Sequence, residues 1–224
     1  MSQVTHKFFS KSGQKNAPVQ MGGVTNWRKK LSNFWPVQIC PTSLNVAGIQ
    51  IFTEQHTFSS VEQAFHWAKF HFTTQQLTNE HVMDIYSHYP NILLQHVDSK
   101  NIDDERFLQE IRPFMVKVKS CSGKGTMKKA GYSLDVQKWN EARVQVTLHL
   151  LRTRRNVDEE FQHILRASGT SYLLHTDRAG PRSFWGGSDK GGENMLGQLL
   201  MQIRNELLNP KWSILKKKEE FNLI

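Results

Sequence analysis

The chain lacks several features that would place a protein outside the cell or in a membrane. Its 224 residues include 2 cysteines, Cys40 and Cys121, which are too few for a disulfide framework and lack metal-site spacing. No apolar run is long enough to span a membrane, and no charged segment followed by an apolar one opens the sequence. None of the 10 histidines pairs with another across a glutamate in a zinc motif. We therefore expect an intracellular, cytoplasmic protein with no metal, no cofactor and no membrane contact. The oligomeric state is left open, with a monomer favoured.

Negative charge is missing from long parts of the chain. No acidic residue precedes Glu54, although lysines and arginines do, and the span from Arg112 to Lys129 is also basic without an acid. A third basic cluster is Lys216 to Lys218, and the formal net charge is +9. Clustered positive charge attracts polyanions, which favours a nucleic-acid or polyphosphate partner. The alternative is a solvated surface that only keeps the protein in solution.

Hydrophobic periodicity and turn residues predict a single helix-rich α+β domain with a few short strands. The domain is expected over 27–210, between a polar extension or flap of little structure at 1–26 and a basic tail at 211–224. A basic surface loop is predicted at 120–131, and strands at 48–53 and 172–175. Helices are predicted at 59–71, 78–88, 103–111, 139–154, 158–167 and after residue 194, with Asp158 as an N-cap.

The most informative segment is glycine-rich and runs from Trp185 to Gly197 into an apolar helical pattern. Four of its glycines allow the main chain to approach a ligand closely: Gly186, Gly187, Gly191 and Gly192. A helix N-terminus favours negative charge, so we expect a phosphate to bind there. Asn194 either bonds a ribose or phosphate oxygen or caps the helix.

Four motifs, in the same order, resemble those of the NADAR family, also called YbiA-like proteins. The first, Leu31-Ser32-Asn33-Phe34, resembles (L/F)-S-N-F, and the second, Ser60 to Phe70, resembles S-x-E-x-x-(F/Y)-x-x-x-K-(F/A). Trp139 stands where the family has a tryptophan that opens its penultimate long helix, and Trp185 to Arg204 resembles W-G…N-x-L-G-x-x-L-M-x-x-R. The resemblance covers about Leu31 to Leu208 and implies a NADAR/YbiA-like domain.

The resemblance implies a metal-independent N-glycosidase that hydrolyses a base–ribose bond. One implied substrate is ADP-ribose attached to guanine in DNA, whose removal reverses the modification. Another is a ribosylamino-pyrimidine 5′-phosphate intermediate of riboflavin synthesis. The basic clusters favour ADP-ribosylated DNA, because a small monophosphate does not need three of them. A module that binds ADP-ribose or nucleic acid without catalysis is the third possibility.

Glu62 stands at the position of the family's motif glutamate, which implies a catalytic role. A carboxylate beside C1′ stabilises an oxocarbenium-like state or activates water. The alternative is structural, since Ser59-x-x-Glu62 has the form of a capping box. Lys69 matches the motif lysine and either neutralises a phosphate, attacks C1′ through its amine, or lies in solvent. His66, one turn after Glu62, is more typical of packing or a surface position.

One position departs from the family pattern. Arg182 stands three residues before Trp185, where many members carry an acidic residue, and Asp177 is the only carboxylate nearby. Either Asp177 replaces the missing carboxylate as a catalytic group, or Glu62 works alone. The expected ligand-binding residues are Asn33, Phe34, Trp139, Arg182, Trp185, Gly186, Gly191 and Asn194. The tryptophans are suited to stacking on a base or sugar, with core packing as the alternative.

A resemblance to a nucleotide-binding P-loop is misleading. Ser122-Gly123-Lys124-Gly125-Thr126 has no glycine at the required upstream position and follows no predicted strand. We interpret it as part of the basic surface loop.

Overall fold

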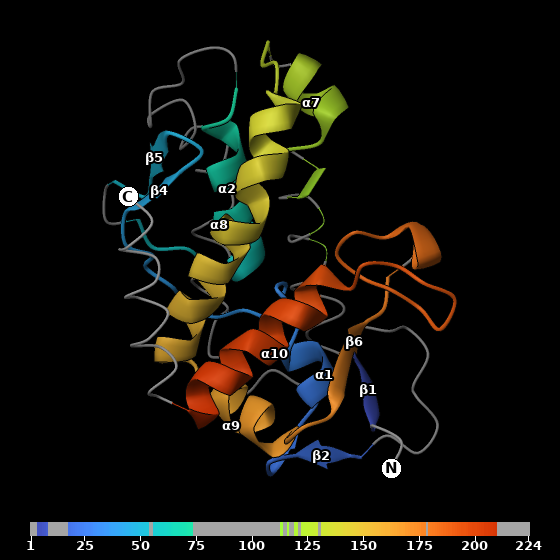
Figure 1. Cartoon of the computed structure of the whole chain (residues 1–224). Helices are drawn as coiled ribbons and strands as arrows, with labels where there is room; N and C mark the ends of the chain where they lie inside the picture. The colour runs from blue at the N-terminus through green and yellow to red at the C-terminus, as the bar shows by residue number, and fades with distance from the viewer. Residues whose placement is uncertain are drawn as a thin grey trace. The chain divides into compact units, whose positions relative to one another are not determined.

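A computed structural model describes residues 4–8, 18–53, 56–73, 113, 116, 119–120, 122–129, 131–177 and 179–209. The chain divides into two compact units, each described by itself. The terminal unit joins Met1–Ser32 to Asp158–Ile224, and the central unit is Asn33–Val157. The described residues form helices and a few short strands, which confirms the predicted helix-rich α+β class (Figure 1). The predicted helices at 78–88 and 103–111 and the tail at 211–224 lie outside the described residues.

The terminal unit contains two small sheets. Strand β1 (Thr5–Phe8) pairs in parallel with β6 (Tyr172–His175), while β2 (Gln20–Met21) and β3 (Val24–Thr25) form an antiparallel pair. Strand β6 confirms the prediction at 172–175. The expectation of little structure before residue 26 is wrong for β1, whose Phe8 is fully buried. Its partner strand lies far along the chain, so no local pattern identifies the pairing.

The helices of the terminal unit are α1 (Trp27–Lys30), α9 (Glu159–Ala167), the short 3-10 helix η3 (Gly180–Arg182) and α10 (Met195–Leu208). The side chain of Asp158 accepts a hydrogen bond from the N–H of Phe161 at 2.9 Å, which confirms the predicted cap of α9. Helix α10 packs against α9 and β6 through an apolar stripe that includes Leu196, Leu199, Leu200 and Ile203.

The central unit is built around two packed helices. Helix α2 (Val61–Phe70) packs against α8 (Val136–Val157), and α7 (Lys124–Lys129) lies near them (Figure 1). Helix α8 extends beyond the predicted 139–154 at both ends. The prediction of a loop at 120–131 is wrong for α7. The lysines and glycine of this segment are typical of a surface loop, but the segment forms a helix whose Met127 is buried.

A hairpin packs against α8 through its first strand. Strands β4 (Leu44–Val46) and β5 (Ile49–Ile51) pair antiparallel, and β5 confirms the middle of the strand predicted at 48–53. The turn between them uses Ala47 and Gly48, whose φ angles of 50° and 72° suit a tight hairpin turn. Among the helices that the structure describes, none has the length and apolar character needed to cross a membrane.

Candidate functional site

Helix α2 begins with a cap that differs by one residue from the predicted one. The hydroxyl of Ser60 accepts a hydrogen bond from the N–H of Gln63 at 3.1 Å, so Ser60 is the N-cap. The side-chain oxygen of Gln63 accepts from the N–H and the hydroxyl of Ser59, at 2.7 and 2.8 Å. The capping-box alternative for Glu62 is therefore wrong, because Gln63 occupies the position that satisfies the helix start.

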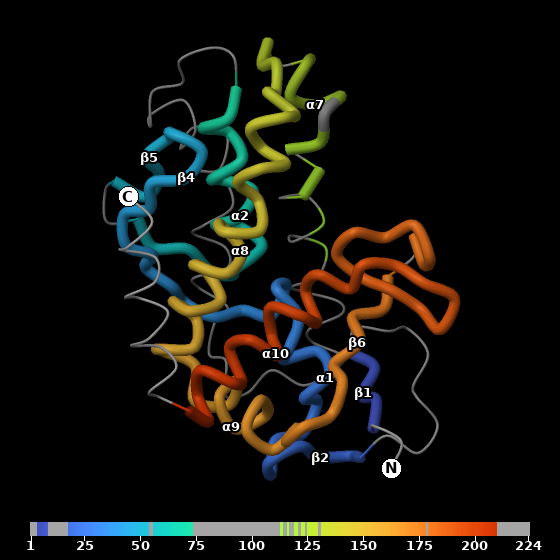
Figure 2. The backbone as a smooth tube through the Cα atoms, viewed as in Figure 1, coloured from blue at the N-terminus to red at the C-terminus, as the bar shows by residue number. Residues whose placement is uncertain are grey.

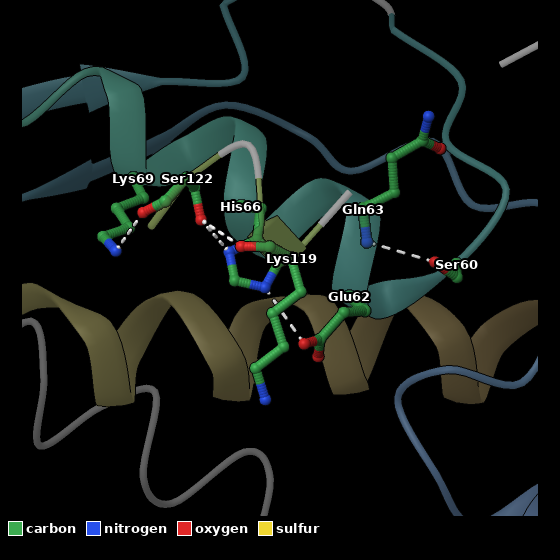
Figure 3. Close-up of polar contacts among 7 residues, drawn as sticks. All are labelled: Ser60, Glu62, Gln63, His66, Lys69, Lys119 and Ser122. Carbon is green, nitrogen blue, oxygen red and sulfur yellow. Dashed lines mark hydrogen bonds and ion pairs between the residues drawn. The ribbon is translucent and has the colours of Figure 1, made fainter. Parts of the chain in front are cut away.

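Glu62 is buried, and its side chain points to a histidine. Only 8 % of the residue is exposed, and its Oε1 lies 3.0 Å from Nε2 of His66, one turn along α2 (Figure 3). The N–H of Glu62 donates to the carbonyl of Asn33 at 3.0 Å, which ties the Leu31–Phe34 motif to the start of α2. A buried carboxylate needs such partners, because loss of water around an ionised group is costly.

The histidine joins α2 to a distant segment. Nδ1 of His66 forms a very short hydrogen bond with the hydroxyl of Ser122, which is also 3.4 Å from the carbonyl of Lys119 (Figure 3). His66 and Ser122 are 56 positions apart, so no local pattern could pair them. The spacing of Glu62 and His66, by contrast, is the helical i, i+4 spacing at which two side chains meet.

Lys69 contacts the same serine through the main chain. Its Nζ donates to the carbonyl oxygen of Ser122 at 2.6 Å (Figure 3). Burial lowers the pKa of the Lys69 amine below its ordinary value, which raises the fraction of neutral amine at a given pH. Glu62 and Lys69, both predicted to be catalytic, are therefore linked through His66 and Ser122 by one chain of contacts.

The other predicted residues of the central unit differ in exposure. Asn33 and Phe34 are half-buried, and Nζ of Lys119 lies 5.8 Å from the centre of the Phe34 ring. The buried side-chain oxygen of Asn33 has no hydrogen-bond partner among the described residues. Trp139 is 6 % exposed, and its ring centre lies 5.0 Å from that of Phe65. This environment favours the core-packing alternative for Trp139.

The glycine-rich loop of the terminal unit runs from β6 to α10 and closes on itself (Figure 2). The N–H groups of Met195 and Leu196, the first two residues of α10, donate to the carbonyls of Phe184 and Trp185, both at 3.1 Å. The helix N-terminus that we expected to bind a phosphate is thus occupied by loop carbonyls. The reason is that the glycines let the chain fold back tightly enough to satisfy its own donors.

Asn194 ties this loop to β6. Its Oδ1 accepts from the N–H of His175 at 2.9 Å, and its Nδ2 donates to the carbonyl of Leu173 at 2.8 Å and to the hydroxyl of Tyr172 at 2.9 Å. Asn194 is the N-cap residue of α10, as the capping alternative predicts, but with a φ of 50° it makes no side-chain cap hydrogen bond. Its predicted contact with a ligand is untested, although the side chain is already well bonded and 1 % exposed.

Asp177 organises the turn that leads into the loop. Its Oδ1 accepts from the N–H groups of Ala179 and Gly180, at 2.9 and 3.2 Å, and its Oδ2 accepts from the hydroxyl of Ser183. That hydroxyl in turn accepts from the N–H of Gly186 at 2.8 Å. Through these contacts Asp177 holds the turn in place. Its catalytic role stays a prediction.

The remaining predicted residues of the loop have mixed surroundings. Arg182 and Gly191 are exposed, and Trp185 is half-buried with its ring centre 5.0 Å from that of Phe184. A Cβ atom on Gly186 would lie 2.8 Å from the carbonyl oxygen of His175, so glycine is needed there for packing. Arg182 and Gly191 are the members of this set that an outside ligand could reach most easily.

No group of three or more histidine, cysteine, aspartate or glutamate side chains that could hold a metal ion occurs in the described part of the chain. The contacts from Glu62 to Lys69 bring together a buried carboxylate, an imidazole, a hydroxyl and an amine.

The fold places the chain among proteins with a YbiA-like architecture. The solved NMR structure of the E. coli protein YbiA is similar, with a TM-score of 0.51 and 19 % sequence identity. The similarity covers 95 % of this chain and 89 % of YbiA. At this level of identity it shows the fold, which agrees with the motif resemblance of the sequence. No protein-family model and no curated protein sequence matches the chain.

Proposed function

We propose that the chain is an N-glycosidase that hydrolyses the bond between a base and ribose, with ADP-ribose on guanine in DNA as the preferred substrate. One observation carries the proposal: Glu62 is not part of the helix cap but is held by His66 in the described site. This geometry contradicts the capping-box alternative for Glu62 and supports its use in catalysis. The YbiA-like fold and the motif resemblance support the same reaction class.

The chemistry requires a carboxylate close to C1′. As the bond from C1′ to the base nitrogen breaks, its electron pair leaves with the base and positive charge develops on the ribose. Glu62 stabilises that charge and accepts a proton from the attacking water, whose oxygen forms the new bond to C1′. The departing base nitrogen takes up a proton. The products are unmodified guanine in the DNA and free ADP-ribose, or, with the pyrimidine phosphate, the free pyrimidine and ribose 5-phosphate.

Lys69 offers a second route. Its neutral amine attacks C1′, the base leaves with the bonding electrons, and opening of the ribose ring gives an imine that water hydrolyses. The burial that lowers the pKa of Lys69 favours this use of the amine.

The described residues also support a ribose and a polyanion as parts of the substrate. The buried oxygen of Asn33, which has no hydrogen-bond partner among the described residues, is an acceptor for a ribose hydroxyl. Lys119, Lys128 and Lys129 are exposed on the central unit, where they can meet phosphates. Lys117 of the same basic cluster lies outside the described residues.

The test is a product assay with two substrates. The protein is incubated with an oligonucleotide carrying ADP-ribosyl-guanine and, separately, with a ribosylamino-pyrimidine 5′-phosphate. Released ADP-ribose is measured in the first reaction, and released pyrimidine and ribose 5-phosphate in the second. We expect release from the oligonucleotide, and Glu62→Gln is the inactive control. Release only from the pyrimidine phosphate would support the small-metabolite alternative. Binding of ADP-ribosylated DNA without release would support the non-catalytic module.

Salt dependence separates the DNA substrate from the small one. Neutralisation of phosphates by lysines releases counterions, so the affinity for DNA should fall steeply as salt rises. The triple change of Lys119, Lys128 and Lys129 to glutamine should flatten this dependence. An affinity that does not respond to salt would count against DNA as the substrate.

A further inference from the structure

Ser122 lies at the junction of the candidate site. Its hydroxyl bonds to Nδ1 of His66, and its carbonyl oxygen accepts a hydrogen bond from Nζ of Lys69 at 2.6 Å. His66 in turn meets Glu62 at 3.0 Å (Figure 3). One residue on the segment before α7 thus contacts the amine directly and the carboxylate through one imidazole.

The direction of hydrogen bonding along this chain follows from the donors available. An ionised carboxylate only accepts, so Nε2 of His66 must carry the hydrogen that it donates to Glu62. In the neutral ring Nδ1 is then an acceptor, and the hydroxyl of Ser122 is its donor. The Glu62 carboxylate therefore sets the hydrogen on Nε2, and the hydroxyl of Ser122 is the partner that fixes the other side of the His66 ring.

Burial makes this arrangement specific. Ser122 is 1 % exposed and His66 is 6 % exposed, so water cannot easily replace either partner. The same burial argues against Ser122 as a nucleophile, although serine, histidine and glutamate stand in series, because a substrate has no access to its hydroxyl. The hydroxyl has one further acceptor, the carbonyl of Lys119 at 3.4 Å.

We propose that His66 and Ser122 are positioning residues of the glycosidase: His66 orients the Glu62 carboxylate, and Ser122 orients both His66 and the Lys69 amine. The inference rests on the proposed function, since it assigns these two residues to the same reaction. Neither residue touches the reacting atoms. The consequence is that a change at Ser122 disturbs the carboxylate without removing it.

The tautomer of His66 can be tested without any activity. Two-bond correlations from the ring carbon-bound hydrogens to the two ring nitrogens in ¹⁵N-labelled protein report which nitrogen is protonated. We expect the Nε2–H form in the unaltered chain and a less uniform population in Ser122→Ala, which loses the hydroxyl donor. A predominant Nδ1–H form in the unaltered chain would overturn the inference. The tautomer can be measured even if the protein hydrolyses neither proposed substrate. That outcome would contradict the proposed function but not the contacts of His66.

Kinetics test the positioning role directly. In His66→Gln the side-chain amide can still donate to Glu62, so kcat should stay within about tenfold of the unaltered chain. In His66→Phe that donor is lost, and kcat should fall about 100-fold with little change in KM, because misplacement of a catalytic group by about 1 Å costs that much. Thermal unfolding of each variant checks that it folds.

The serine variants provide the matched control. Ser122→Ala removes the hydroxyl and keeps the carbonyl that binds Lys69, so we expect about a tenfold lower kcat. Thr126→Ala removes an exposed hydroxyl from α7 and should leave kcat unchanged. Full activity of His66→Phe, or a His66→Gln as impaired as His66→Phe, would overturn the positioning role.

Discussion

The glycine-rich loop before α10 and the face of α2 are both rich in polar contacts, but they use them differently. In the loop, the carboxylate of Asp177 and the amide of Asn194 bond mainly to main-chain groups of the loop and β6. On α2, Glu62 and His66 bond side chain to side chain. Side chains that bond to main-chain groups hold the backbone in its conformation. Titratable side chains that bond to one another are candidates for catalysis. The glycine-rich loop, which has the clearest sequence pattern, therefore uses its polar side chains mainly to hold the backbone.

Among the changes that test this comparison, Glu62→Gln is expected to have the largest effect on the rate of hydrolysis. The change keeps the shape of the side chain and removes its charge, and general acid–base catalysis contributes about 10² to 10⁴ in rate. We expect a loss of that size in single-turnover hydrolysis with an unchanged fold, since the cap of α2 is made by Ser60 and Gln63. Near-normal turnover would show that the α2 face is not catalytic.

Lys69→Arg should have the next largest effect. Arginine keeps the positive charge but cannot form an imine, so we expect about a 10²-fold loss of activity if the amine attacks C1′. Borohydride added during turnover should trap a sugar on Lys69 in the unaltered chain and none in the variant, as mass spectrometry would detect. An active Lys69→Arg would mean that the lysine is an electrostatic contact and that water attacks directly.

Gly197→Ala should destabilise the region where α10 follows the glycine-rich loop, and it does not change any residue of α2. A Cβ atom there would lie 2.2 Å from the carbonyl oxygen of Leu173 and 2.5 Å from the amide of Asn194. We expect a loss of about 3 kcal/mol in the free energy of unfolding, measured in urea. The control is Gly125→Ala in α7, where a Cβ atom meets nothing within 4 Å and helix propensity should make the change neutral or stabilising. Equal stability of the two variants would refute the close packing of the loop.

Stability should also fall as the pH drops, through a histidine at the end of α2. Burial, and then the charge of His56, lower the pKa of His71 from 6.5 to about 4. Between these values the unfolded chain binds more protons than the folded one, so stability is complete above pH 6.5 and declines until about pH 4. We expect about 3 kcal/mol over this window, and His71→Phe should flatten the curve. An equally steep curve in the variant would assign the effect to other groups.

The smallest effect is expected from Asp177→Asn. The new amide nitrogen cannot accept the hydrogen bond from Ser183, so the free energy of unfolding should fall by about 1 kcal/mol. Turnover should change less than tenfold if Asp177 only organises the loop. A loss as large as that of Glu62→Gln would instead confirm the prediction that it is a catalytic carboxylate, and the contrast between the two regions would fail.

Much of the fold could be predicted because its signals are local. Helices α2 and α9, strand β6 and the cap at Asp158 follow from spacing and turn chemistry within a few residues. The pairing of β1 with β6 could not be predicted, because its two strands are far apart in sequence. Helix α7 was hidden by glycine and lysine residues that are typical of a loop.

The sequence by itself determined which residue types are available and where the motif glutamate and lysine stand on one helix. The tertiary structure decided how they are used. It moved the cap to Ser60, joined Ser122 to His66 across 56 positions, and directed the donors of the glycine-rich loop to the loop's own carbonyls. The physical reason is that hydrogen bonds depend on which groups the folded chain brings within about 3 Å, and local patterns cannot specify that for distant segments.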